Sequence, residues 1–462
     1  MKEIKHKDFS NEIAIIIKNK NFKKQEVVLE TGRKKAFLTK TKNDYQLYFD
    51  GIFPYDGTKK LKVRMDGEQY TLKSADFKEP MHSGLAAIPA QHTFDVESIS
   101  KGSINNATFF KMFFFDDSQK TNIFYSKVET IRAYGHSFNC IQLCVLQKRY
   151  EITQHTEEDQ SYFIIENLDE VSLQDFEDNA YAIQKGIGFL VGYMPGGENY
   201  IFAEENFLYK GLSRKSLKSI YHPVTSNPYS RLHEESEREI ADHYYGKIKV
   251  VPVAVISELV IQVQQNMDFS VAMILLMEVS SLKSVVSMPG VFSLILESLA
   301  NCIIIKEEKV EKLIDDKDLS DTIISNLNLV IDNYINQISQ DAATKIRRRL
   351  HEINKPINYK RLTNAEKLRA PFDQLKIILT KEDEKAINYR NALLHGKILM
   401  NGEVKRTSEE IDDHMMYISA KLYTLLSKLI LKMCGYEGYV INHSKFYERN
   451  SIKTTEEYFN KI

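Results

Sequence analysis

The sequence lacks a large net charge, a long apolar run and tryptophan, and the first two absences narrow the class of protein. Its 462 residues carry a formal net charge of −1. A chain without a global basic field can bind nucleic acid only through a local basic patch. The apolar stretch Val271–Met277 ends at Glu278, far short of the ~20 residues that a membrane-spanning helix needs. We therefore expect a cytoplasmic protein that does not engage a membrane.

A secretion signal and a disulfide pattern are also missing. The apolar run Ile13–Ile17 is too short for the core of a signal peptide. The four cysteines stand at positions 140, 144, 302 and 434, and their spacing matches neither a CxxC motif nor a zinc ribbon. So few cysteines favour a reducing compartment, in which the thiols stay free and buried. We expect no cofactor and no metal ion.

Residues 1–205 have the pattern of a β-rich domain. Short β-branched and aromatic runs, such as Thr108–Phe115 and Ile141–Leu146, are separated by turn residues. Asp66-Gly67 lies between two such runs and predicts a β-hairpin. Several short strands at this spacing indicate a β-sandwich-like domain or a strongly twisted sheet.

A helical repeat interrupts the strand pattern at residues 171–192, and a further strand follows at 200–202. The glycine-rich part of this helix, Gly186–Gly192, resembles a dinucleotide-binding loop. It lies inside a helical pattern, however, and no βαβ unit surrounds it. We therefore expect these glycines to serve packing.

The rest of the chain is predicted to be helical. A polar, proline-interrupted connector covers residues 206–249, and apolar residues then recur at helical spacing from 250 to 435. Residues 436–462 are expected to form a peripheral C-terminal tail. The predicted fold class is α+β multidomain, with an N-terminal β-sandwich-like domain at 1–205 followed by an all-α bundle.

Several helix ends can be placed within the bundle. Met288-Pro289-Gly290 is expected to end one helical segment. Thr407 with Glu410 has the spacing of a capping box, and Thr380 with Asp383 has a looser version of the same pattern. The second pair would begin a short helix.

That short helix leads into the stretch Ile387–Lys397, which carries the residues of greatest chemical interest. Asn391 and His395 are four residues apart and share a helix face, and Gly396 stops the helix. A histidine can transfer a proton to or from the attacking or leaving oxygen of a phosphodiester. The guanidinium of Arg390 can bind the phosphate and stabilise its charge in the transition state.

The spacing of arginine and histidine alone is a weak signal. Arg238 and His243 show a similar spacing, but they have acidic neighbours, lack the asparagine and lie in the polar connector. We interpret that pair as a surface feature. His395 and Arg390 could likewise be an ordinary helix histidine and an exposed arginine.

With its asparagine and its place late in a helical domain, the pattern Arg390-Asn391-x-x-x-His395 resembles the Arg-x4–6-His motif of the HEPN superfamily. The resemblance implies a helical bundle that dimerises to form a composite, metal-independent ribonuclease site. Arg390 and His395 would be the catalytic pair and Asn391 the supporting polar residue. Many members also carry an acidic residue on an early helix, and Glu278 and Glu297 are both candidates. The β-rich half, with the segment that follows it, is similar to that of ApeA-type anti-phage HEPN proteins.

A local basic patch accompanies the motif. Residues 345–406 contain 16 Lys and Arg against 7 Asp and Glu, a local net charge of +9. A basic surface beside the site would suit an RNA backbone, although charge runs are more often solvated helix faces. The candidate RNA-binding residues are Arg347, Arg348, Arg349, Lys397, Lys405 and Arg406.

The sequence thus predicts a homodimeric endoribonuclease of bacterial anti-phage defence or stress response. His395 would be the general acid or base, Arg390 the phosphate clamp and Asn391 the residue that orients them. The N-terminal domain would act as a sensor for a phage-derived or cellular trigger. One alternative is a non-catalytic HEPN-fold protein that binds RNA or a partner, with a β-sandwich ligand-recognition domain. Another is a carbohydrate- or peptide-binding protein with a helical oligomerisation domain.

Overall fold

The structure of this chain is a computed structural model. It describes residues 8–30, 34–41, 44–50, 60–74, 77–78, 91–116, 124, 127–133, 138–157, 160–212, 214–224, 235–303, 314, 316–353, 364–389, 392–393, 407–446 and 455–462. The chain divides into two compact units. Unit 1 comprises Met1–Cys302 and Ile377–Ile462, and unit 2 comprises Ile303–Lys376.

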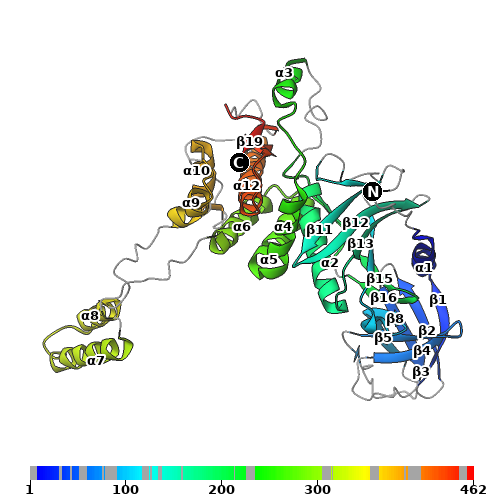
Figure 1. Ribbon diagram of the computed structural model, residues 1–462. Helices are drawn as coiled ribbons and strands as arrows, with labels where there is room; N and C mark the ends of the chain where they lie inside the picture. Colours follow the sequence, from blue (N-terminus) through cyan, green and yellow to red (C-terminus); the bar gives the residue numbers. More distant parts are fainter. Residues whose placement is uncertain are drawn as a thin grey trace. The chain divides into compact units, whose positions relative to one another are not determined.

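Unit 1 contains a large antiparallel sheet (Figure 1). Its fifteen described strands follow the order β10-β11-β12-β13-β9-β15-β16-β8-β5-β4-β1-β2-β3-β7-β6. The strands are β1 (Lys24–Leu29), β2 (Lys34–Thr41), β3 (Asp44–Asp50), β4 (Lys60–Met65), β5 (Glu68–Lys73), β6 (Phe77–Lys78), β7 (Gln91–Val96), β8 (Ser98–Lys101), β9 (Lys111–Asp116), β10 (Ile131–Ala133), β11 (Phe138–Val145), β12 (Lys148–Glu157), β13 (Gln160–Asn167), β15 (Glu198–Ala203) and β16 (Asn206–Gly211). Together with the helices below, this sheet confirms a mixed α+β protein.

The predicted hairpin at Asp66-Gly67 is confirmed. Met65 pairs with Glu68, so a two-residue turn joins β4 to β5. Asp66 has a φ of 52° and Gly67 a φ of 83°. Positive φ at both central residues is the geometry that matches the twist of a hairpin, which is why Asp-Gly is favoured there.

A buried ion pair lies inside the core of the sheet. Lys40 on β2 and Glu198 on β15 are 2.9 Å apart, and both side chains are buried. The Lys40 ammonium also lies over the rings of Tyr45 and Tyr209, 5.0 and 5.5 Å from their centroids. Burial and the charge of Glu198 raise the pKa of both tyrosines, so their hydroxyls stay protonated at neutral pH. α1 (Ser10–Lys20) adds Ile13 to the same core.

The predicted helix at 171–192 is α2 (Leu173–Val191). Ser172 accepts a hydrogen bond from the Asp175 amide at its start, and Gly192 ends it with a φ of 75°. A Cβ atom at Gly186 would lie 3.1 Å from Val260, and one at Gly188 would lie 2.7 Å from Met194. The glycine-rich segment therefore serves close packing, as predicted.

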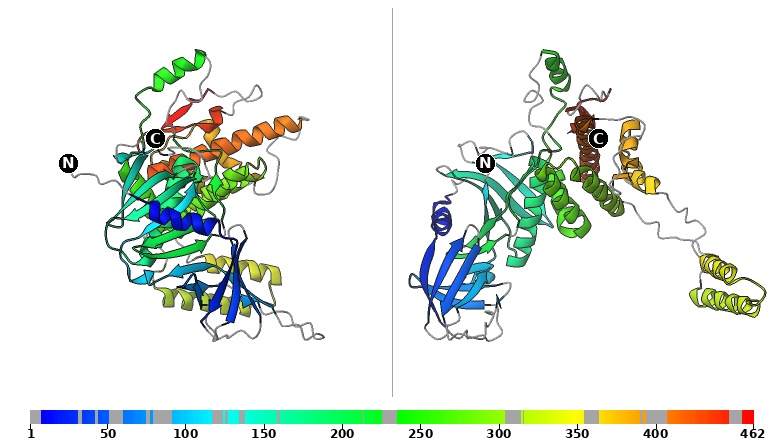
Figure 2. Two further views of the ribbon diagram at one scale, coloured as in Figure 1. Left: turned by 90° about the vertical axis from the view of Figure 1, so that its right-hand side faces the viewer. Right: turned by 180° about the vertical axis from the view of Figure 1, so that it is seen from behind.

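Helices form most of the chain after residue 234 (Figure 2). Unit 1 contains α3 (Glu235–Tyr244), α4 (Val253–Gln265), α5 (Met267–Leu282), α6 (Ser287–Ile303), α10 (Lys381–Asn388) and α12 (Ser408–Met433). α4 packs between α2 and β11, which connects the helices to the sheet. Unit 2 contains α7 (Lys317–Asn333), α8 (Gln340–Ile353) and α9 (Asn364–Gln374). The smaller elements are β14 (Tyr193–Met194) with β17 (Leu217–Lys218), β18 (Tyr439–Ile441) with β19 (Phe459–Lys461), α13 (His443–Phe446) and the 3-10 turn Ile104–Asn106.

One helix boundary differs from the prediction. Met288-Pro289-Gly290 begins α6 instead of ending the preceding segment. Proline is tolerated in the first turn of a helix, where its missing amide hydrogen has no partner to lose. Asn266 separates α4 from α5 and caps α5 by accepting a hydrogen bond from the Phe269 amide.

Among the described residues, no single helix is both long enough and apolar enough to cross a membrane. The bent pair α4–α5, with 108° between its halves, meets the length and composition criteria only when both helices are taken together.

The described parts of the segment after Gly435 pack against the rest of unit 1, whereas the sequence predicts a peripheral tail. β18 and β19 pair in antiparallel fashion. The side chains of Asn442, His443 and Ser444 are buried, and His443 hydrogen-bonds to the backbone carbonyl of His222 at 2.7 Å. Polar residues that end a chain look solvent-exposed in sequence, but here they are satisfied by partners distant in the chain.

All four cysteines are free, as predicted. Cys140 and Cys434 are buried and Cys302 is half-buried, whereas Cys144 is exposed, contrary to the expectation of buried thiols. Burial raises the pKa of the Cys434 thiol, which makes it unreactive.

Candidate functional site

The helix that leads into the predicted motif is α10, and it is described up to the motif itself. Arg390, Asn391 and His395 lie outside the described residues, as do Gly396 and Lys397. Tyr389 ends α10, and the amide of Leu393 donates to the Tyr389 carbonyl at 2.9 Å. Ala392 and Leu393, the next described residues, are helical.

A complete capping box begins α10, which confirms the predicted cap. The Asp383 amide donates to Thr380 Oγ1 at 3.1 Å, and the Thr380 amide donates to Asp383 Oδ2 at 3.0 Å. An eight-residue helix is too short to be stable by propensity alone. Its caps and its packing therefore determine where it points.

A cluster of three buried charges and one partly buried carboxylate joins α10 to α12. Asp383 Oδ1 lies 2.8 Å from the Lys421 ammonium, and Asp383 Oδ2 lies 3.6 Å from the Lys428 ammonium. Lys421 also pairs with Glu456, which precedes β19. Thr380 Oγ1 donates to Glu456 Oε1 at 3.0 Å. We call Asp383, Lys421, Lys428 and Glu456 the anchor cluster.

The anchor cluster is balanced, with two carboxylates and two ammonium groups. Burial by itself raises the pKa of Asp383, but the charges of Lys428 and Lys421 outweigh it, so that pKa lies below its usual range. Burial also opposes ionisation of Glu456, and Lys421 again outweighs it and lowers the pKa. For Lys428 the burial dominates, and its pKa is lowered despite the nearby Asp383.

The C-terminal segment completes this cluster. Asn442 Nδ2 donates to Glu456 Oε2 at 3.1 Å, and Ser444 Oγ donates to the same oxygen at 3.4 Å. A cavity of about 1070 Å³ opens beside the cluster, and its lining includes Thr380, Lys428 and Glu456. Residues of α10, α12 and the C-terminal segment thus meet at the start of α10.

A histidine that the sequence did not single out lies beside Tyr389. The His414 ring on α12 contacts the Tyr389 ring edge-on, with 6.2 Å between centroids. Tyr389 is the residue immediately before Arg390. Nothing in the sequence links positions 389 and 414, because helix periodicity gives no distance between different helices.

The predicted RNA-binding residues do not form one described patch. Lys397, Lys405 and Arg406 lie outside the described residues. The three consecutive arginines are on α8, in unit 2, whereas α10 belongs to unit 1. Arg347 is ion-paired with Asp332 of α7, and its two neighbours, Arg348 and Arg349, are exposed.

The two acidic candidates lie in unit 1. Glu278 on α5 accepts a hydrogen bond from Arg214 Nε at 2.8 Å, and Glu297 is half-buried on α6. Neither can be placed against Arg390 or His395, so the choice between them stays open.

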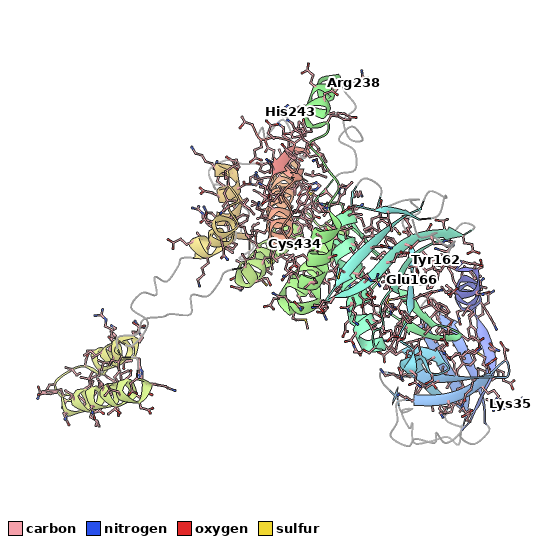
Figure 3. The ribbon with its side chains drawn as sticks, in the orientation of Figure 1. Lys35, Tyr162, Glu166, Arg238, His243 and Cys434 are labelled. Carbon is pink, nitrogen blue, oxygen red and sulfur yellow. The ribbon has the colours of Figure 1, made fainter. Side chains whose placement is uncertain are left out.

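The second arginine–histidine pair is at the surface, as predicted. Figure 3 shows Arg238 and His243 on α3, and both side chains are exposed. His243 Nε2 lies 3.1 Å from Lys247 Nζ, one helical turn further on. Across the residues that the structure describes, no three His, Cys, Asp or Glu side chains are grouped so that they could hold a metal ion.

Comparisons with known proteins found no relative of this chain. The chain matches no protein-family model, no curated protein and no solved structure.

Proposed function

We propose that this chain is a metal-independent endoribonuclease of the HEPN type that acts in bacterial anti-phage defence or another stress response. Its helical part would form a HEPN-like bundle, and two copies would combine their motifs in one composite site. The β-sandwich-like N-terminal domain would bind a phage-derived or cellular trigger and restrain the activity until then.

The anchor cluster carries the proposal. Burying Asp383, Lys421 and Lys428 is costly, and a well-packed apolar set of similar volume would often be as stable. The cluster instead fixes the direction of α10, which runs directly into Arg390. Catalytic groups must be held within about 0.5 Å of their productive positions by rigid neighbours, and the cluster supplies such support.

Each motif residue has a defined role in the proposed reaction. His395 would transfer a proton to or from the 2′-hydroxyl or the leaving oxygen. Arg390 would bind the phosphate through paired hydrogen bonds and stabilise the charge that develops there. Asn391 would orient one of them. None of these steps needs a metal ion.

Substitution of the motif tests this function against a matched control. We expect Arg390→Ala and His395→Ala to reduce RNA cleavage by at least ~100-fold, the usual cost of losing a general acid or base. The control is Arg238→Ala with His243→Ala, which removes the same side chains from an exposed helix and should leave cleavage unchanged. Cleavage should also persist in EDTA.

Equal RNA cleavage by the wild type and by the Arg390→Ala/His395→Ala variant would refute the proposal. So would loss of cleavage in EDTA. A protein that binds RNA but never cleaves it would favour the non-catalytic HEPN-fold alternative.

A further inference from the structure

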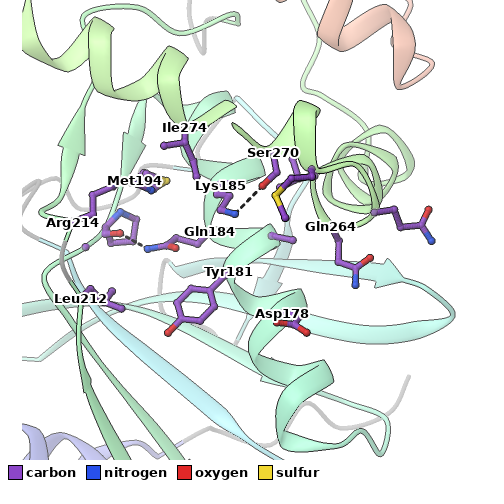
Figure 4. A pocket seen from close by; sticks show the side chains of 16 residues that line it. Asp178, Tyr181, Gln184, Lys185, Met194, Leu212, Arg214, Gln264, Ser270 and Ile274 are labelled. Carbon is purple, nitrogen blue, oxygen red and sulfur yellow. Dashed lines mark hydrogen bonds between the residues drawn. The ribbon is translucent and has the colours of Figure 1, made fainter. Parts of the chain in front are cut away.

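A cleft of about 530 Å³ opens between α2 and the α4–α5 region (Figure 4). Its walls are α2, the segments that follow β14 and β16, and the junction of α4 with α5. Ligand sites in proteins typically occupy 300–1,000 Å³ and combine apolar walls with a few placed polar groups. This cleft has both, because Met194, Leu212 and Ile274 line it together with Lys185 and Arg214.

One face of α2 contributes the polar groups. Asp178, Tyr181 and Lys185 follow the i, i+3, i+7 spacing and therefore share that face. Burial raises the pKa of Tyr181 to about 12, so its hydroxyl is protonated at neutral pH. Asp178 and Lys185 lie at opposite ends of this row (Figure 4). A ligand would therefore meet negative charge at one end of the cleft and positive charge at the other.

Lys185 is a half-buried cation without a carboxylate partner in the described structure. Its ammonium donates one hydrogen bond, to Ser270 Oγ at 2.9 Å. Burial lowers its pKa, and the positive charge of Arg214 lowers it further. An ammonium has three donors, so two remain available beside a second cation.

Arg214 is held in place from two directions. Its Nε donates to Glu278 Oε1 at 2.8 Å, and its carbonyl accepts from the Gly197 amide at 2.7 Å. A Cβ atom at Gly196 would lie 2.7 Å from the same carbonyl, so only glycine allows this approach. A guanidinium has five N–H donors. Only Nε has a partner within the described part of the chain, which leaves the four terminal donors available.

We propose that this cleft binds a small organic phosphate, with Lys185 and Arg214 on the phosphate group and the apolar wall against the body of the ligand. Two adjacent cations repel each other, and a dianion placed between them relieves that repulsion. A phosphate offers several acceptor oxygens to the donors left over, and arginine binds it through two parallel hydrogen bonds. The proposal is independent of RNA cleavage, because it rests on this cleft alone.

Adenosine monophosphate and adenosine provide a matched pair of probes for the full-length protein. We expect phosphorus-31 resonances of adenosine monophosphate and of inorganic phosphate to broaden with added protein. Adenosine should raise the thermal midpoint less than its monophosphate does. Succinate separates a phosphate site from a general carboxylate site, and it should bind at least tenfold more weakly than adenosine monophosphate.

Two substitutions should shift binding in opposite directions. Lys185→Met should weaken adenosine monophosphate at least tenfold, while leaving the thermal midpoint of the ligand-free protein unchanged or higher, because it removes a half-buried charge. Glu278→Gln removes the competing carboxylate and should tighten binding several-fold. Lys218→Met, an exposed lysine on β17, is the control and should bind like the wild type.

Three outcomes would overturn the proposal. The first is that the phosphorus-31 signals of both probes stay sharp in the presence of wild-type protein. The second is equal broadening for the wild type and Lys185→Met, which would place the phosphate elsewhere. The third is that succinate binds as tightly as adenosine monophosphate. Because no RNA is present, each outcome is separate from the fate of the ribonuclease proposal.

Discussion

Asp383 on α10 and Lys421 on α12 form an ion pair of 2.8 Å in which the two side chains are 0% and 1% exposed. A pair so completely removed from water contributes little net stability, but each partner becomes costly when the other is lost. The pair therefore makes the position of α10 depend on a charge balance.

Asp383→Asn should lower the free energy of unfolding by about 3–5 kcal/mol, the usual cost of breaking a buried pair. The loss follows because Lys421 and Lys428 would then share only Glu456. Urea unfolding followed by circular dichroism measures it. The double variant Asp383→Asn/Lys428→Met restores the balance and should recover part of the loss. A loss below about 1 kcal/mol would contradict the importance given to the cluster.

The anchor cluster should also make stability sensitive to acid. Asp383 and Glu456 have folded-state pKa values below their usual range. The unfolded chain therefore takes up protons first, and stability is lost as the pH falls from about 4 through the folded-state values. Urea midpoints between pH 3 and pH 7 should fall less steeply for Glu456→Gln than for the wild type. Identical slopes would show that Glu456 is not paired in solution.

Lys428 should make folding stability depend on pH in the alkaline range. Its pKa is lowered from 10.5, so the unfolded chain binds the proton more tightly and stability rises as the pH increases toward that value. Lys428→Met should abolish this alkaline increase. Thermal midpoints at pH 7, 9 and 10 measure the effect, and an unchanged slope in the variant would contradict it.

The cap of α10 should matter more than the equivalent cap of α12. Thr380→Ala removes a capping hydrogen bond, worth about 1 kcal/mol, and also the bond to Glu456. Thr407→Ala removes the same capping bond from the 26-residue helix α12. We expect Thr380→Ala to lower RNA cleavage as well as stability, while Thr407→Ala lowers stability alone. Thr380→Ser keeps the hydroxyl and should retain cleavage; equal cleavage in all three variants would argue against a positioning role.

Lys40 in the sheet core allows a comparison between a buried and an exposed pair. Lys40→Met leaves Glu198 buried without its cation, and we expect a loss of about 3–5 kcal/mol in unfolding free energy. Lys18→Met breaks the exposed pair with Asp66 and should change stability by less than about 1 kcal/mol. Urea titration of both variants is the measurement. Similar losses for the two would mean that Lys40 is solvated in solution.

The elements predicted correctly from sequence are those whose signals are local. The Asp66-Gly67 turn, the ends of α2 and both threonine caps each depend on residues within about one helical turn of one another. The order of the sheet could not be predicted in this way. β9 lies between β13 and β15, and such pairing depends on segments far apart in the sequence.

The sequence gives a weaker indication of the anchor cluster. Lys421 and Lys428 are seven residues apart in the mostly apolar second half of α12, so they share a face that the apolar pattern assigns to the core. Two buried lysines imply buried carboxylates, but many acidic residues could have supplied them. The choice of Asp383 and Glu456 required the three-dimensional structure.

The anchor cluster also has a consequence for the order in which the protein is made. A ribosome completes residue 383 first, then 421, and reaches 456 last. Until Glu456 emerges, Lys421 and Lys428 face Asp383 as their one carboxylate in the anchor cluster, and Thr380 lacks its hydrogen bond to Glu456. Under the proposed function, this order of synthesis would delay RNA cleavage while the messenger is still being translated. With this arrangement, the anchor cluster that holds α10 is complete only after residue 456 has been made.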